Sequence, residues 1–410
     1  VILIQTKRGN AGGKKVSVSI TNQTSWDVIN RELEKQGDFG QGYPRYWLTG
    51  NESQAYDYLY VPNTGFSWGD RIAGRSGSAD EVRQGNQRFE SETGNVYYPI
   101  LSKNSQEVYN QTNRDQVFQT GFTWNKSVGV NFNNNGSTTY LSFADWDQKG
   151  IIRNGSDYRR STVRINNETK LTEKLKVRVN TSFIRTESNR IQQGSNLNGL
   201  YLGYLRTAPD FDNRDYKGTY YNTNGVPSLN AHRGYRNYLG TAAPIYNNPA
   251  WTLNEQENPN SVYRFIINPE LNWNIYKNIN LTARYGFDYY NDTRETFFPV
   301  NSAGGVSVGS FSRNEITERN ESVNVFLSST HVINSDVNFS WILGAQAESF
   351  NYTSFGGSSQ DFTNPFVGDL RIFGNAEAAN ESPGLFRQQQ RKSAVYSVLN
   401  AELFGQVYLE

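Results

Sequence analysis

A residue-by-residue alternation runs twice through residues 261–292, SVYRFIINPELNWNIYKNINLTARYGFDYYND, and the chain turns between the two legs at 276–278. In each leg, every second residue is mostly apolar or aromatic, beginning with Tyr263 on the first leg and Ile279 on the second. Side chains of a strand alternate between two faces, so this pattern predicts a β-hairpin with one apolar and one wet face. Each leg has about 12 to 14 residues, whereas an ordinary strand has about 5 to 6.

Pro269 lies inside the first leg of this hairpin. Proline has no backbone N–H and therefore withholds a hydrogen bond from the strand pairing. We expect a bulge or a local irregularity at this position.

The same alternation recurs in further strands, about eleven in all. Two tight turns fall within 133–136 and 334–336, and a last one falls near 404–406. A short strand at 1–6 precedes all of them, and the pattern also allows a short helix at 26–35. The other predicted strands cover residues 15–21, 121–132, 138–146, 157–167, 175–186, 321–334 and 336–350.

Tight turns alternate with long polar loops, at about 22–120, 187–260, 293–320 and 351–391. In an up-and-down meander, alternate connections lie at opposite ends of the strands. Short turns at one end and long loops at the other are typical of outer-membrane barrels. A strand tilted by about 45° needs about 9 to 11 residues to cross the bilayer, which explains the length of the strands.

The composition agrees with an all-β transmembrane barrel. Only 36% of the 410 residues are hydrophobic, and aromatic residues make up 14%, which favours β structure. The net charge of +1 gives no electrostatic case for nucleic acid as a partner. No apolar run reaches the roughly 18 residues of a membrane-spanning helix, and the absence of cysteine excludes disulfides.

A soluble β-sandwich or a glycan-binding jelly roll is the alternative fold. Its connections would have a median of about 4 to 6 residues, which the long loops exceed. Aromatic residues near the strand ends, such as Tyr263, Trp273 and Tyr289, are also typical of the girdles of a membrane barrel. A surface barrel or adhesin without transport activity remains a further alternative.

Four segments resemble the SusC/RagA type of TonB-dependent transporter. The first strand, VILIQTKRGNAGGKKVSVSI, is similar to the family's junction of plug and barrel, and FSWGDR at 66–71 resembles an S-W-G motif in its first long loop. Residues 118–167 are similar to the family's strand, turn and Q-x-G-I loop, and NPAW at 248–251 resembles its N-P-x-W segment. The resemblance assigns residues 1–13 to the last plug strand and 14–410 to roughly the first half of the barrel.

The resemblance implies a barrel of about twenty-two strands closed by a plug. It implies import of oligosaccharides or peptides through the outer membrane of a Gram-negative, Bacteroidetes-like bacterium, with a SusD-like surface lipoprotein as a lid. Energy would come from TonB, ExbB and ExbD, which would act through chain that precedes residue 1.

Aromatic side chains in the loops are candidates for contacts with a ligand or with the lid, because their faces stack on sugar rings or cradle peptides. They could equally fold the loops onto each other. The candidates are Tyr43, Tyr46, Trp47, Tyr56, Tyr58, Tyr60, Trp68, Tyr220 and Tyr235.

Arginines on the polar sides of strands are candidates for contacts in the lumen. Such charges could bind acidic groups of the plug or a ligand, or simply belong to a wet interior. These arginines are Arg164, Arg178, Arg264 and Arg284.

Asp210, Asp212 and Asp215, together with Asn213, form an oxygen-rich cluster that could bind Ca²⁺, although it lacks the spacing of an EF-hand. No other cofactor is expected. The two histidines are far apart, and no hydrolase, metalloprotease or P-loop motif occurs, so we expect no enzymatic activity.

Overall fold

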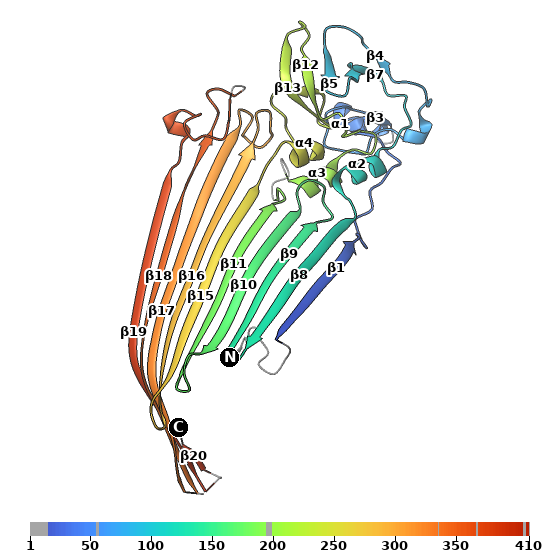
Figure 1. Cartoon of the computed structure of the whole chain (residues 1–410). Helices are drawn as coiled ribbons and strands as arrows, with labels where there is room; N and C mark the ends of the chain where they lie inside the picture. Colours follow the sequence, from blue (N-terminus) through green and yellow to red (C-terminus); the bar gives the residue numbers. More distant parts are fainter. Residues whose placement is uncertain are drawn as a thin grey trace.

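The computed structural model describes residues 15–54, 57–193, 199–334, 336–365, 368–404 and 407–409. Eleven antiparallel strands form one large sheet in which each strand pairs with its neighbours in chain order (Figure 1). This is the predicted meander, while the predicted strand at 1–6 lies outside the described residues. In order of pairing, the strands are β1 (Val16–Asp27), β8 (Gly121–Asn134), β9 (Ser137–Lys149), β10 (Asp157–Lys170), β11 (Leu175–Asn189), β15 (Pro259–Tyr276), β16 (Ile279–Phe298), β17 (Ser310–Asn334), β18 (Val337–Gln360), β19 (Gly384–Leu403) and β20 (Val407–Leu409).

Long loops gather at one end of this sheet and short turns lie at the other (Figure 1). The strands extend further toward the loops than the alternation predicts. The third loop is confined to 299–309, whereas 293–320 was expected, and the fourth to 361–383, whereas 351–391 was expected. These strand extensions carry polar residues on both faces, so their sequence does not alternate, yet their backbones stay paired.

The predicted helix at 26–35 is wrong. Trp26 belongs to β1, where it pairs with Phe122, and the two ring centroids are 5.6 Å apart. Residues 28–36 then follow an irregular path. The Nζ of Lys35 donates hydrogen bonds to the carbonyl oxygens of Tyr204 and Thr207, so contacts with a distant segment determine this conformation.

The two faces of the sheet are unlike, as the alternation predicts. Phe143, Ile165 and Trp273 lie on the apolar face and are 44%, 45% and 46% exposed, respectively. In a β-sandwich, a second sheet would cover such residues. One sheet with an uncovered apolar face therefore excludes the sandwich alternative.

Pro269 interrupts the pairing of β15 with β16. The pairs stop at Ile267 and Phe287 and resume at Glu270 and Arg284 in the same register. The irregularity expected at Pro269 is therefore present, as a gap in the pairing rather than as a bulge.

The loops 28–120 and 190–258 fold together over the end of the large sheet (Figure 1). Strands from both loops form a five-stranded sheet in the order β14 (Asn237–Thr241), β13 (Pro227–Gly234), β12 (Lys217–Tyr221), β5 (Arg88–Ser91) and β6 (Val96–Tyr97). Two further pairs are β2 (Gly42–Pro44) with β3 (Tyr58–Tyr60), and β4 (Glu81–Val82) with β7 (Ile100–Ser102). The helices are α1 (Tyr46–Thr49), α2 (Asn110–Val117), α3 (Leu200–Arg206) and α4 (Pro249–Asn254), with 3-10 turns at Glu52–Gln54, Ile72–Gly74 and Ala378–Asn380. Within the described residues, no helix is long and apolar enough to cross a membrane.

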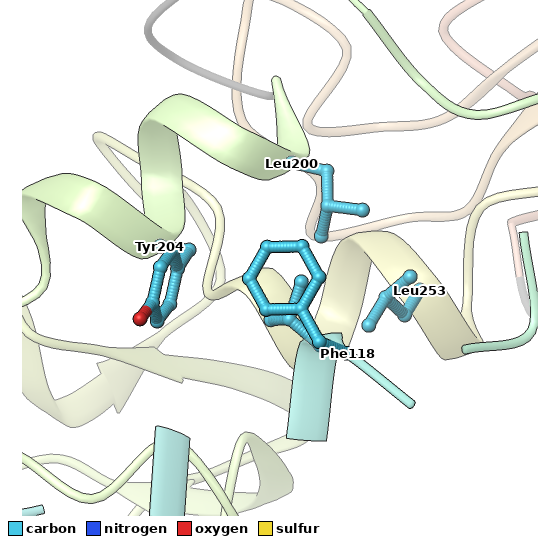
Figure 2. Packing of buried hydrophobic residues seen from close by; sticks show 5 residues of the cluster. Phe118, Leu200, Tyr204 and Leu253 are labelled. Carbon is cyan, nitrogen blue, oxygen red and sulfur yellow. The ribbon is translucent and has the colours of Figure 1, made fainter. Parts of the chain in front are cut away.

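A hydrophobic core joins the loops beside the large sheet. Figure 2 shows Phe118 facing Leu200 and Tyr204 of α3 and Leu253 of α4, and all four side chains are buried. The ring centroids of Phe118 and Tyr204 are 5.4 Å apart with their planes almost perpendicular, a favourable arrangement for aromatic pairs. This contact fixes α3 and α4 against the segment that enters β8.

The NPAW segment forms the start of α4. Asn248 caps the helix by accepting a hydrogen bond from the N–H of Ala250, and Pro249 occupies the first turn, where its missing N–H costs nothing. Trp251 is 1% exposed, and its Nε1 donates to the hydroxyl of Ser302 in the third loop at 3.0 Å. The motif thus links the second loop to the third.

Candidate functional site

Three aromatic rings of the first long loop form an exposed group, which we call the aromatic platform: Tyr43, Trp47 and Phe66. The rings of Tyr43 and Trp47 stack with centroids 5.6 Å apart, and Phe66 meets Trp47 edge-on at 5.3 Å. Trp47 and Phe66 are each 48% exposed. Packing against one another holds these rings in place while leaving their outer surfaces available to a partner.

Gly42 brings the platform together. Its N–H donates to the carbonyl of Phe66, and its own carbonyl accepts from the N–H of Trp68, so β2 lies between β3 and 66–68. Its φ of +149° is unfavourable for residues with a side chain, and a Cβ there would lie 1.9 Å from the carbonyl oxygen of Leu59. Only glycine allows this close approach.

A second aromatic group lies beside the platform. Phe39 contacts Tyr58 and Trp68, with centroids 6.1 and 6.5 Å apart, and Trp68 is 58% exposed. Tyr46 in α1 is 37% exposed. Of the predicted aromatic residues, the structure thus brings Tyr43 and Trp47 into one exposed group and Tyr58 and Trp68 into another, while Tyr56 lies outside the described residues.

Three predicted contact residues are instead part of the interior of the loops. Tyr235 is 2% exposed and belongs to a buried cluster against which Tyr220 packs. Tyr60 lies under the guanidinium of Arg75 and the ammonium of Lys103. Burial, followed by the negative charge of Asp210, raises the pKa of Tyr60. These rings fold the loops together, which is the alternative that the sequence left open.

The predicted calcium ligands do not converge. Asp210 accepts hydrogen bonds from the guanidinium of Arg75 at 2.8 Å and from the N–H of Gln41 at 3.0 Å. Asp212 instead pairs with Arg214 at 2.6 Å.

Asp215, the third predicted ligand, accepts hydrogen bonds from Thr93, Asn95 and Tyr97. Burial alone would raise the pKa of Asp215, but these hydrogen bonds outweigh it and lower the pKa. The carboxylates are therefore committed to separate structural partners. Across the described part of the chain, no three acidic, histidine or cysteine side chains form a group that could hold a metal ion.

The four predicted arginines share the polar face of the large sheet, and two of them belong to a chain of ion pairs. Arg178 binds Glu168 at 2.6 Å and Glu270 at 2.8 Å, and Arg284 binds the same Glu270 at 2.7 Å. The chain crosses β10, β11, β15 and β16. Its charges largely cancel, so these two arginines do not form a basic wall.

The other two arginines of this face differ from each other. Arg264 forms a two-point ion pair with Asp288, through Nε at 2.8 Å and Nη2 at 2.5 Å. Arg164 is exposed, and it forms no ion pair with a carboxylate of the described residues. It is the one predicted arginine whose charge is available to another group.

Several residues that organise this region carry no signal in the sequence. His232 is fully buried, its Nε2 accepts the N–H of Asn248, and its ring lies 4.8 Å from that of Trp251. Burial lowers the pKa of His232 to about 3. Phe39 was also missed, because an isolated aromatic residue in a polar segment does not reveal which rings it will meet.

The fold matches solved transporter structures. Over 98% of its length, the chain superposes on 42% of a chain in a structure of the RagAB peptide transporter, with a TM-score of 0.66 and 15% sequence identity. Chains of the RagAB peptide importer in the "closed-closed" and "open-open" states match over the same 98%, with a TM-score of 0.60 and 16% identity. No family model and no curated protein matches the sequence.

The chain spans less than half the length of the RagAB chains it matches, since it covers 42% of them. At this level of sequence identity, the match establishes the fold. The matching proteins are transporters and importers, not enzymes, and the match confirms the barrel architecture predicted from strand length and connection pattern. The chain therefore has the fold of somewhat less than half of a RagAB transporter chain, which is the fold expected from the resemblance to the SusC/RagA type.

Proposed function

We propose that this protein imports peptides or oligosaccharides through the outer membrane of a Gram-negative bacterium by a TonB-dependent mechanism. The observation that carries the proposal is the fold shared with the RagAB peptide transporter over 98% of the chain. That likeness makes peptides the first ligands to test. Energy would come from TonB with ExbB and ExbD, and a SusD-like lipoprotein would cover the loop end.

The two faces of the large sheet support this placement. Exposed apolar side chains such as Phe143 and Trp273 suit contact with lipid, and the opposite face carries charges that need water or a polar partner. We assign the face of Arg164, Arg178, Arg264 and Arg284 to the lumen. Arg164 would be available to an acidic group of the plug, because it has no ion-pair partner in the described residues.

We assign ligand or lid contact to the aromatic platform and to Trp68. Rings held by one another lose little conformational freedom on binding, which favours their use as a contact surface. Isothermal titration calorimetry of the intact protein with a peptide pool and, separately, a pool of neutral oligosaccharides tests this assignment. We expect Trp47→Ala and Phe66→Ala to weaken binding by about 3- to 10-fold each.

Trp273→Ala is the matched control, because Trp273 is similarly exposed, at 46%, but lies on the apolar face of the large sheet. It should leave ligand binding unchanged. If the platform variants bind ligand normally but no longer retain a SusD-like lipoprotein that is co-expressed with the protein, the platform contacts the lid. If they change neither ligand binding nor retention of the lipoprotein, the assignment is wrong.

A further inference from the structure

Two cations share one buried carboxylate on the apolar face of the large sheet. Asp145 of β9 pairs with Lys126 of β8 and with Ser161 of β10 in neighbouring positions across the sheet. Its carboxylate lies 3.2 Å from the Nζ of Lys126 and 3.2 Å from the Nε of Arg159, and it accepts a hydrogen bond from Ser161 at 2.7 Å. We call Lys126 and Arg159 the cation pair.

Exposure differs sharply within this group. The side chain of Asp145 is 2% exposed, whereas those of Lys126 and Arg159 are 37% and 56% exposed. The carboxylate fixes the positions of both cations but cannot itself be reached from outside. Two positive charges held by one negative charge leave donor groups free to bind an anion.

An apolar surface begins next to the cation pair. Val128, Phe143 and Val163 are paired neighbours across the same three strands, one step toward the turns, and they are 38%, 44% and 38% exposed. On the side of the cation pair that faces the loops, the Nζ of Lys126 lies 4.1 Å from the ring centroid of Trp124. Tryptophan favours the interface between hydrocarbon and water, so the cation pair lies where an apolar band meets a polar zone.

Two acidic residues lie one step nearer the loops than Lys126, at the level of Arg159. Asp147 and Glu187 flank Arg159 on β9 and β11, and Arg185 pairs with Glu187. Lys126 therefore borders the apolar band, while Arg159 starts level with these two carboxylates and extends its guanidinium to Asp145, next to the band. This order matches an amphiphile whose acyl chains lie on the band and whose phosphate groups lie just above it.

We infer that Lys126 and Arg159 bind a phosphate group of lipid A in the outer leaflet, with an acyl chain lying over Val128, Phe143 and Val163. This inference rests on the proposed outer-membrane placement, in which the loop end faces outward. The chemistry required of the ligand is an anionic phosphate directly attached to a bulky apolar body. Lipid A is a better candidate than a phospholipid, because the cation pair lies toward the loop end, which faces outward, and lipopolysaccharide occupies the outer leaflet.

Native mass spectrometry of the intact protein in detergent tests the inference, with lipid A, dephosphorylated lipid A and phosphatidylglycerol as separate probes. We expect Lys126→Gln and Arg159→Gln each to reduce retention of lipid A by about five-fold. Each variant leaves Asp145 with one cation. A triple variant, Lys126→Gln with Arg159→Gln and Asp145→Asn, removes all three charges without leaving a buried carboxylate unpaired, and it should lose binding further.

Arg164→Gln is the control, because it removes an exposed cation from the opposite face of β10 and should not change lipid retention. Wild-type protein should hold dephosphorylated lipid A and phosphatidylglycerol less tightly than lipid A. Equal retention of lipid A by the wild type and the triple variant would overturn the inference, and so would equal affinity for phosphatidylglycerol. Uptake of peptide by the same variants is measured separately, so that failure of import and failure of lipid binding are distinguishable.

Discussion

The guanidinium of Arg75 lies 2.8 Å from the carboxylate of Asp210, although the two residues are 135 positions apart in the sequence. Each side chain is only 2% exposed. Arg75 comes from the first long loop and Asp210 from the second, and Asp70 completes the group at 2.7 Å. This ion pair connects the two loops directly under the residues that lead into the aromatic platform.

Removal of Arg75 should therefore destabilise the loops strongly. Arg75→Met leaves Asp210 buried without its cation, and such a change costs about 3 to 5 kcal/mol. Hydrogen exchange of amides in residues 38–75 measures the loss. Arg45→Met is the control, because Arg45 and Asp57 are 41% and 50% exposed, and an exposed ion pair contributes about 1 kcal/mol or less. Equal exchange in both variants would contradict this prediction.

Charged substitutions on adjacent residues of β15 test which face of the sheet contacts lipid. Leu271 lies on the apolar face and Asn272 on the polar face. Leu271→Arg should lower the free energy of unfolding by up to about 2 to 4 kcal/mol, whereas Asn272→Arg should have little effect. Urea unfolding of the intact protein in lipid vesicles compares the two. A larger loss for Asn272→Arg would show that the faces are assigned the wrong way round.

The buried His232 should make the loops less stable in mild acid. Burial lowers its pKa to about 3 in the folded state, while an unfolded histidine titrates near about 6.5. Stability is therefore fully present above pH 6.5 and is lost as the pH falls toward 3, because only the unfolded chain takes up the proton. Between pH 7 and pH 5, the loss is about 2 kcal/mol.

Hydrogen exchange of residues 231–250 at these two pH values measures that loss. His232→Gln keeps an acceptor for the N–H of Asn248 and does not titrate. The variant should show a smaller difference between the two pH values than the wild type. The same difference in both proteins would exclude His232 as the cause.

Gly42 is predicted to be essential for the aromatic platform. Gly42→Ala would place a methyl group 1.9 Å from the carbonyl oxygen of Leu59, so β2 and β3 must separate. Near-ultraviolet circular dichroism should report loss of the fixed aromatic environment. Gly50→Ala is the control, since Gly50 has φ +67° but nothing within 4 Å of the added Cβ, and it should cost only about 1 to 2 kcal/mol. An unchanged spectrum for Gly42→Ala would contradict the prediction.

The large sheet could be predicted because the alternation and the turns that define each hairpin lie within short stretches of sequence. Each hairpin can be recognised from two alternating segments joined by a short turn. At the turn that contains Lys277, the observed cross-strand pairs of β15 and β16 join residues that the alternation places on the same face. The strand ends nearest the long loops could not be predicted, because both faces are polar there and the alternation disappears. Residues 299–309 therefore form a much shorter loop than expected.

The tertiary structure of the loops could not be predicted from the sequence, because its contacts join segments that are far apart in the chain. Phe89 pairs with Tyr220, and Trp251 reaches Ser302, in contacts that no periodicity signals. Composition predicts that aromatic residues matter in the loops but not which of them remain exposed. Trp47 is exposed and Tyr235 is buried, although both lie in similar polar, aromatic-rich stretches.

Uptake of labelled peptides by intact cells tests the proposed import most directly. Cells with the gene, cells without it, and cells whose proton gradient has been collapsed by an uncoupler are compared, with oligosaccharides as a second set of probes. We expect uptake of at least one probe to fall to background both without the gene and without the gradient. Unchanged uptake of every peptide and oligosaccharide in cells that lack the gene would contradict it.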